Sequence, residues 1–399
     1  MKYQKEQTVM LLILSILPLV FLRGQYFPVL DDFIMYRGYP LYSASYLLGT
    51  VRIWTSRPIA NLLDLFVWSR FSDCLFFLLF LIWGLKIISV VLLSEFFKNQ
   101  NWPRLPLMVL LLFCPVGIEA TGWLSASTRI AIGLFFLSVA LYFCMMRKLW
   151  LYSLFLFLSF GCYEQFWALG ILLSCKELEK KYCWISIFLA GTMGLYTLVC
   201  GAFSTTPRLG EGINTQMLFQ VSELWKTILF YLFPVSFLRG LKSVETFGFM
   251  ALCCLFIALT MVTKKEIESK SGKKWGWALF VSSYLPFLFT EQGLSFRMAY
   301  LSFIGLSLIV PPKKYLWIGI ALFFCIGSVG EMLDYQKAGI ADQQILEEIV
   351  SGKQYESFTY HDSSVSYGQH ILSITHSDWS LTAGLRALTK NIKLEVTIP

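Results

Sequence analysis

The chain has 399 residues, of which 56% are hydrophobic and only 15% are charged. Soluble chains average roughly 25% charged residues, so this composition excludes a water-soluble globule. The mean hydropathy is +0.63. Apolar runs such as 76–94 are continuous and as long as a membrane-spanning helix, unlike the short alternating strands of a transmembrane β-barrel. The sequence therefore predicts an all-α polytopic membrane protein.

The formal net charge of +8 does not indicate a nucleic-acid partner. In a membrane protein, an excess of Lys and Arg marks the cytoplasmic loops. All ten cysteines lie in or beside apolar runs without metal-ligand spacing, and they are interpreted as small core residues. No complete set of metal ligands is recognisable in the sequence, so no metal site and no cofactor are assigned. Whether the protein needs a divalent metal stays open.

Apolar runs separated by charged clusters predict about eleven transmembrane helices. The first follows Lys2 and Lys5 without a signal-peptide cleavage site, so we expect it to be retained. Basic clusters such as Arg147 and Lys148 place the N-terminus in the cytoplasm and the C-terminus outside. The predicted spans are 8–23, 73–97, 105–118, 127–146, 149–163, 165–175, 183–200, 246–263, 275–290, 297–311 and 315–332.

Residues 149–175 allow two interpretations. Two helices in this segment would each extend only about 20 Å, less than the hydrocarbon thickness of about 30 Å. We favour a helical hairpin whose turn lies in a cavity open to the outside, with residues 219–240 in the outer leaflet. The alternative is one long span, which would make 226–239 a further span and break the positive-inside pattern.

Two long outer segments complete the predicted architecture. In the first outer loop, 24–72, apolar positions at helical spacing in 41–54 and 58–68 are typical of helices in the membrane interface. Residues 333–399 lose the long apolar runs. The sequence thus predicts a transmembrane domain, 1–332, and a small extracytoplasmic α+β appendage, 333–399. In this appendage we expect helices near 340–351 and 379–390 and strands near 355–361 and 393–398.

The candidate catalytic residues are Asp31 and Asp32, just beyond the outer end of the first span. An isolated pair of aspartates usually marks a solvated turn. So close to the bilayer, however, two adjacent carboxylates are costly, and like charges can raise one pKa toward values suited to a general base. The sequence leaves open which of the two is the base.

Charged residues near the outer helix ends form a second group of candidates. Arg129 and Arg297 begin inward-running helices, where a guanidinium and free helix N–H groups can bind a phosphate, although each could instead snorkel toward water. Glu119, Glu164 and Glu291 occupy the opposite helix ends near aromatic rings, which indicates a polar cavity of the kind that sugars favour. The candidate substrate-binding residues are Arg57, Arg129, Tyr163, Glu164, Gln165, Glu291 and Arg297.

The sequence resembles the GT-C superfamily of integral-membrane glycosyltransferases, which take a sugar from a polyprenyl-phosphate carrier on the outer face of the membrane. The resemblance rests on the pair Asp31-Asp32, on the interfacial segments 41–54 and 58–68 that follow it, on arginines at outer helix starts, and on the short motif 163-YEQ-165. Within the superfamily, the chain looks most like bacterial plasma-membrane enzymes that add side-branch sugars to O-antigen, wall polysaccharide or teichoic acid.

The residues and the resemblance together predict an inverting hexosyltransferase whose active site is extracytoplasmic. Asp31 or Asp32 would take the proton of an acceptor hydroxyl, while Arg297 and Arg129, with Arg57, would stabilise the departing polyprenyl phosphate. Its partners would be the lipid-linked sugar donor, a glycan or lipid-linked acceptor and the bilayer. The alternatives are an O-antigen-type polysaccharide polymerase, with its catalytic residues in a large late loop, and a lipid or sugar transporter, with charges near the midplane.

Overall fold

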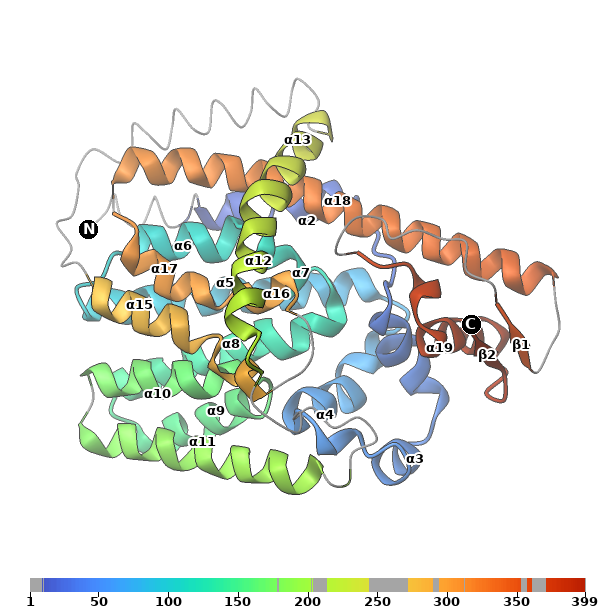
Figure 1. The fold of residues 1–399 in the computed structure, drawn as a ribbon, viewed down its shortest axis with the longest axis horizontal. Coiled ribbons are helices and arrows are strands. Elements are labelled where there is room, and N and C mark those ends of the chain that lie inside the picture. Colours follow the sequence, from blue (N-terminus) through green and yellow to red (C-terminus); the bar gives the residue numbers. More distant parts are fainter. Residues whose placement is uncertain are drawn as a thin grey trace.

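The computed structural model describes Val9, Phe203 and residues 11–177, 179–201, 214–243, 272–289, 294–311, 313–352, 357–360 and 371–398. The chain is about 80% helical, and its long helices lie side by side in a bundle (Figure 1). The predicted all-α membrane class is therefore confirmed.

Five helical stretches are long and apolar enough to cross a membrane. They are α5 (Leu75–Asn99), α8 (Leu124–Met145), α11 (Lys180–Gly201), the run Met217–Ser243, and most of α18 (Lys314–Gly352). The run Met217–Ser243 consists of α12 (Met217–Thr227), the π-helical turn η5 (Ile228–Leu232) and α13 (Phe233–Ser243).

The other predicted spans are shorter in the described residues, and 246–263 lies outside them. Pro115, for example, separates α6 (Arg104–Phe113) from α7 (Val116–Thr121), because proline removes a helical hydrogen bond. The remaining short helices are α2 (Leu17–Phe21), α9 (Leu149–Phe160), α10 (Gln165–Glu177), α15 (Lys273–Ser282), η6 (Leu285–Phe289), α16 (Phe296–Ala299) and α17 (Ser302–Ile309). Eleven full-length spans are therefore not confirmed by the part of the chain that the structure describes.

Residues 149–175 form two helices, α9 and α10, separated by residues 161–164. The favoured hairpin is thus present, and the single long span is not. Residues 219–240 differ from the prediction, because they belong to a continuous helical run of 27 residues that is long enough to cross a membrane. The π-helical turn η5 comes just before Pro234 and lets the helix continue past that residue.

Helix α8 occupies the centre of the bundle, where it packs against α5, α7, α9 and α10. Helix α18 lies along one side, against α13, α6 and α2, and then extends beyond the bundle toward the C-terminal part of the chain (Figure 1). The first turn of α8 contacts the first outer loop, because the Ser125 N–H donates to Asp32 and the Leu124 carbonyl accepts the Tyr36 hydroxyl.

The first outer loop is built from short helices. Arg52 adopts a left-handed backbone conformation just before η3, so the predicted helix 41–54 is divided between α3 and η3. The predicted helix 58–68 ends as α4 at Phe66. In chain order the elements are η1 (Phe33–Gly38), η2 (Tyr39–Leu41), α3 (Ala44–Gly49), η3 (Ile53–Thr55), α4 (Pro58–Phe66) and η4 (Trp68–Phe71).

The tail contains the predicted strands and its second helix. Strands β1 (Ser357–Thr359) and β2 (Glu395–Thr397) pair in parallel. Between them in the chain lie η7 (Ile374–His376) and α19 (Asp378–Thr389). The predicted helix 340–351 is not separate, because α18 runs unbroken through residue 332. Leu346 of α18 and Phe33 of the first loop share one apolar core with Leu381 of α19. The tail thus packs directly on the first loop.

The cysteines correct one expectation. Cys175 and Cys183 form a disulfide across the turn between α10 and α11, and Cys74 is exposed. The interpretation of all ten cysteines as small core residues is therefore wrong for these three. It is right for the buried cysteines 114, 144, 162, 200 and 325.

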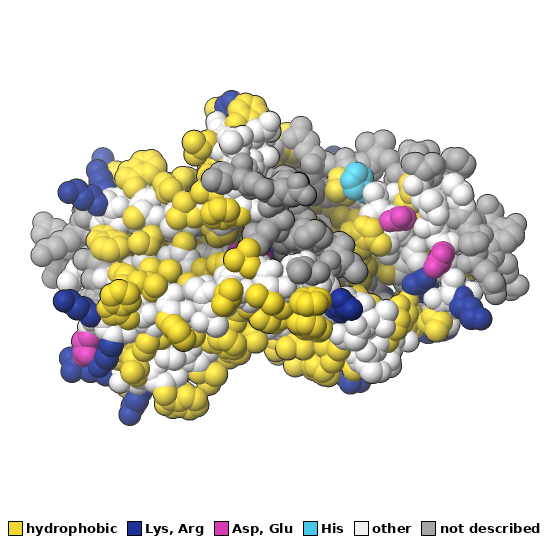
Figure 2. All heavy atoms as spheres, turned by 60° about the horizontal axis from the view of Figure 1, so that its bottom comes forward, with side chains coloured by type: hydrophobic (Ala, Val, Ile, Leu, Met, Phe, Trp, Pro, Cys, Tyr) yellow, Lys and Arg dark blue, Asp and Glu magenta, His cyan; other side chains and the backbone are white. Residues whose placement is uncertain are grey.

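Hydrophobic side chains cover much of the bundle surface in Figure 2, whereas Lys and Arg gather mainly near its ends. On α11, Trp184, Phe188 and Leu195 are each more than 60% exposed. Exposed apolar side chains of this size are expected on helices that face lipid. Together with the five long apolar helices, this surface supports association with a lipid bilayer.

Candidate functional site

The Asp32 carboxylate lies at the N-terminal end of α8 and is fully buried. One of its oxygens accepts hydrogen bonds from the Tyr26 hydroxyl at 2.6 Å and the Val29 N–H at 3.3 Å, and the other accepts the Ser125 N–H at 2.7 Å. Because the first N–H groups of a helix lack partners within the helix, a carboxylate here satisfies one of them and complements the helix dipole. Asp32 thus attaches the first loop to α8.

The two aspartates differ in their surroundings. Burial raises the pKa of Asp32 to about 7, opposed by the hydrogen bonds from Tyr26, Ser125 and Val29, and the neighbouring Asp31 carboxylate raises it further. Repulsion within the pair therefore acts in the predicted direction, but burial is the larger cause. Asp31 is only half-buried. It is the member of the pair that can be reached by a second molecule.

The raised pKa of Asp32 predicts that the protein loses stability as pH rises. An aspartate in the unfolded chain titrates near pH 4. Between about pH 4 and about pH 7, the folded protein therefore keeps a proton that the unfolded chain has released. This contribution to stability is complete below about pH 4 and is lost by up to about 1.4 kcal/mol per pH unit until the pH passes about 7.

Thermal unfolding of the purified protein in detergent tests this prediction. The midpoint should fall as the buffer is changed from about pH 5 to about pH 8, and Asp32→Asn should flatten the dependence because the amide does not titrate. An equally steep dependence in the variant would show that another group is responsible.

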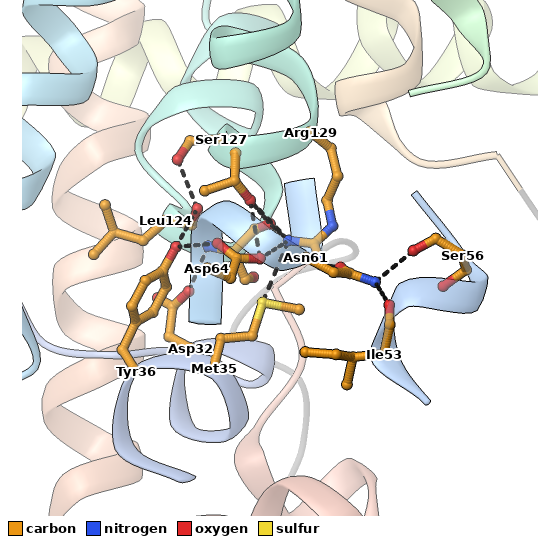
Figure 3. Close-up of polar contacts among 12 residues, drawn as sticks. Asp32, Met35, Tyr36, Ile53, Ser56, Asn61, Asp64, Leu124, Ser127 and Arg129 are labelled. Atoms are coloured by element: carbon orange, nitrogen blue, oxygen red, sulfur yellow. Dashed lines mark hydrogen bonds and ion pairs between the residues drawn. The ribbon is translucent and has the colours of Figure 1, made fainter. Parts of the chain in front are cut away.

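A second buried carboxylate, Asp64 of α4, pairs with Arg129 of α8 (Figure 3). The Arg129 Nη1 lies 2.9 Å from Asp64 Oδ2, and its Nη2 donates to Asn61 Oδ1 at 2.8 Å. The hydroxyls of Thr128 and Tyr36 also donate to the Asp64 carboxylate, each at 3.3 Å. Burial raises the pKa of Asp64 to about 6, against the opposite effect of Arg129. The guanidinium of Arg129 thus favours the ionised form of this carboxyl.

These contacts correct the role predicted for Arg129. Its guanidinium is buried and donates to Asp64, Asn61, Thr128 and the Ser125 carbonyl. It is thus fully engaged within the protein and does not offer an open phosphate site at the helix start. Its function in this structure is to fasten α4 to α8.

Three of the candidate substrate-binding residues, Arg57, Tyr163 and Glu164, come together. The Arg57 Nε lies 3.1 and 3.2 Å from the two Glu164 carboxylate oxygens. Its guanidinium carbon lies 4.1 Å from the centroid of the Tyr163 ring, a cation–π contact. A backbone hydrogen bond from the Ile59 N–H to the Gly161 carbonyl holds the two segments in register.

Arg297 pairs with Glu119. Its Nη1 lies 3.3 Å from Glu119 Oε1, and its backbone N–H donates to Glu119 Oε2 at 3.2 Å. The guanidinium also lies 4.6 Å from the Trp123 ring centroid. The Trp123 indole N–H donates to the Val29 carbonyl at 3.2 Å, so this pair is connected to the loop that carries Asp31 and Asp32.

Gln165 has a structural position. Its buried amide nitrogen donates to the carbonyls of Ser283 and Met298, each at 2.7 Å, which links α10 to two other parts of the bundle. Glu291, the remaining candidate, lies outside the described residues. Among the residues that the structure describes, no three His, Cys, Asp or Glu side chains come together as metal ligands.

Sequence reasoning missed several buried polar residues. Asn61 and Asp64 stand three positions apart in the apolar segment 58–66, so they share one helix face, and that spacing could have identified them. Lys86 of α5 was hidden within a predicted span. It is buried with its ammonium 4.5 Å from the Trp83 ring centroid, and it has no hydrogen-bond partner among the described residues.

Comparisons with known proteins identify no relative of this chain. No protein-family model, curated protein or solved structure matches it.

Proposed function

We propose that the protein is a membrane glycosyltransferase that moves a sugar from a polyprenyl-phosphate carrier to a glycan or lipid-linked acceptor, with inversion at the anomeric carbon. The observation that carries the proposal is the acidic pair of the first loop, whose Asp32 is held against the N-terminus of α8, together with the arginine–carboxylate pairs Arg57–Glu164 and Arg297–Glu119. Such a site combines a proton acceptor with guanidinium groups suited to a phosphate.

Asp31 is the proposed general base, and Asp32 positions it. Both Asp32 oxygens accept hydrogen bonds from the protein, and the side chain is fully buried, so it has no access to a substrate hydroxyl. Asp31 is half-buried and precedes it directly in the chain. The acceptor oxygen attacks the anomeric carbon as its proton passes to Asp31, and the bond from that carbon to the phosphate oxygen breaks.

Arg297 is the proposed ligand of the leaving phosphate. Its side chain is 25% exposed, against 12% for Arg57 and 10% for Arg129, so it is the most accessible of the three paired guanidiniums. This group would stabilise the negative charge that develops on the phosphate oxygen, and Arg57 would contribute to the same stabilisation. No nucleotide is required by this mechanism.

A transporter is the second candidate function, because Lys86 is a buried ionisable residue within the span α5. Ionisable groups inside membrane spans often serve transport. The polymerase alternative has less support, since residues 217–243 form a helical run where a large late loop would be expected.

Proteoliposomes containing a radiolabelled polyprenyl-phosphate hexose and lipid-linked oligosaccharide acceptors separate these functions. Transfer of a single sugar to the acceptor supports the proposal. A ladder of joined repeat units indicates a polymerase, and translocation of unaltered lipid-linked sugar indicates a transporter. Liposomes that contain Asp31→Asn provide the matched control.

We further propose a plasma-membrane location in which the basic turns are cytoplasmic and the first loop is outside. In a cysteine-depleted background, Thr50→Cys should react with an impermeant maleimide in intact cells, whereas Met146→Cys should react only after lysis. Both residues are exposed. The reverse pattern would place the site inside. The result also indicates on which side the turn between Cys175 and Cys183 lies. Its disulfide favours an oxidising compartment outside the cell, whereas its lysines favour the cytoplasm.

Arg297→Lys should lower turnover at least tenfold while changing the apparent affinity for the lipid-linked sugar much less. Lysine keeps the charge but loses the bidentate geometry that matches phosphate, and a group used mainly in the transition state affects kcat rather than KM. Steady-state kinetics on a defined polyprenyl-phosphate hexose measure both constants. If Arg297 merely snorkels, lysine would replace it without loss.

A further inference from the structure

A cavity of about 480 Å³ lies between the first outer loop and the tail. Its walls come from residues 34–51 on one side and from 378–397 on the other, two segments that are far apart in sequence. Figure 1 shows α3 and α19, which carry parts of these walls, at the same end of the molecule. The volume falls within the range of about 300–1,000 Å³ that is typical of small-molecule sites.

Aromatic rings provide the apolar surface of this cavity. Tyr42 and Tyr46 stack with their ring centroids 5.2 Å apart, and Trp379 of α19 belongs to the opposite wall. Tyr46 is 44% exposed and Trp379 is 54% exposed, so both rings can still accept a partner. Flat aromatic faces of this kind pack well against the C–H faces of sugar rings, because they offer a large apolar surface at little entropic cost.

Three charged residues provide the polar groups of this cavity. Arg386 is held in place by hydrogen bonds to the Leu394 carbonyl and the Tyr42 hydroxyl, both at 2.6 Å. Asp378 and Glu395 are exposed carboxylates in the wall of the same cavity. A fixed guanidinium together with carboxylates can donate to and accept from several hydroxyl groups. The two carboxylates also repel a phosphate, which disfavours a phospholipid headgroup or the donor's own phosphate.

The cavity reaches the proposed catalytic residues through Tyr39. This tyrosine lines the cavity and is almost fully buried. Burial raises the pKa of Tyr39, and the carboxylates of Asp64 and Asp31 raise it further. Ile34, three residues after Asp31, lines the cavity as well. The wall of the cavity therefore includes residues that closely follow the proposed base in the chain.

We propose that this cavity binds the acceptor as a short oligosaccharide, with its sugar rings on Tyr46 and Trp379 and its hydroxyls on Arg386, Asp378 and Glu395. The identification of the ligand as the acceptor rests on the proposed function. Binding of a glycan does not, because it follows from the walls of the cavity alone. Donor and acceptor would then occupy separate places, the donor phosphate at Arg297 and the acceptor between the loop and the tail.

Photocrosslinking in the cells that make the protein tests the cavity. The photoreactive residue p-benzoylphenylalanine replaces Val51, which lines the cavity and is 38% exposed, in the full-length protein. The same replacement at Ile392 is the control, since this residue is also in an exposed part of the tail, at 51%, but does not line the cavity. Purified adducts are probed with periodate and a biotin hydrazide, which together label carbohydrate.

We expect a carbohydrate adduct at Val51 that exceeds the Ile392 control at least fivefold and falls at least fivefold in Trp379→Ala or Tyr46→Ala. A lipid adduct, a protein adduct or no excess over the control would overturn the proposal, as would an adduct that survives both substitutions. The proposed function is judged separately. If Asp31→Asn abolishes sugar transfer but leaves the amount of carbohydrate adduct unchanged, both proposals stand. A glycan adduct in a wild-type protein that shows no transfer activity leaves a binding site and removes the enzyme.

Discussion

Asp31→Asn should lower the rate of sugar transfer by about 10²- to 10⁴-fold, the usual contribution of a general base. The amide has nearly the shape of the carboxylate but cannot take the proton of an acceptor hydroxyl. Because Asp31 is only half-buried, the substitution should leave thermal unfolding of the purified protein almost unchanged. The measurement is single-turnover transfer from a polyprenyl-phosphate hexose in proteoliposomes, with unfolding in detergent as the companion experiment.

Asp32→Asn provides the comparison within the same pair. An asparagine amide group would face one of the donors that Asp32 now satisfies, among them the Ser125 N–H and the Tyr26 hydroxyl. We expect it to lower the midpoint of thermal unfolding at about pH 8, as the loss of a buried hydrogen bond does.

Full activity of Asp31→Asn, or a loss of folding in that variant, would remove Asp31 from the role of base.

Asp64→Leu should destabilise the protein by about 3–5 kcal/mol, because it leaves the Arg129 guanidinium buried without its carboxylate. The double variant Asp64→Leu, Arg129→Met should recover much of this loss, since a pair of apolar side chains then replaces the ion pair. Equilibrium unfolding in mixed micelles measures the two free energies and their difference.

The exposed pair of Glu223 and Lys226 is the matched control for this experiment. Its side chains are 45% and 61% exposed, so Glu223→Gln should change the free energy of unfolding by no more than about 1 kcal/mol. If the double variant is as unstable as Asp64→Leu alone, the instability does not come from an unpaired Arg129. The site would then need a different explanation for its buried aspartate.

Much of the architecture could be predicted from the sequence, because lipid imposes simple rules on it. Long apolar runs such as 75–99 fold as helices, and the hairpin 149–175 appears as two of them. The number of full spans could not be predicted, because proline can end a helix, as Pro115 separates α6 and α7, or be passed, as Pro234 is within the run Met217–Ser243. The sequence pattern does not distinguish these outcomes, which depend on the local helical geometry.

The charged residues of the site could be found, but their partners could not. Arg57, Tyr163 and Glu164 were each candidates, but the sequence did not indicate that they meet, nor that Arg297 meets Glu119. The position of Arg129 at a helix start predicts a phosphate ligand. The sequence does not show that Asp64 is its partner, because Asp64 belongs to a loop whose path the sequence does not specify. A buried ion pair forms only where two segments lie close together in space. The sequence identifies the charged residues but does not give the distance between the segments that carry them.

Helix α18 has a geometric consequence for the reach of the proposed enzyme. Its 39 residues extend about 58 Å at 1.5 Å per residue, from the bundle to the tail. No loop interrupts it, and Leu346 near its far end is part of the apolar core that holds α19. In the proposed enzyme, this helix and the first loop on which the tail packs would together fix the height of the acceptor cavity above the bilayer. A glycan whose reactive hydroxyl lies much nearer to or farther from the membrane would not meet Asp31, so this helix would select acceptors by their distance from the lipid surface.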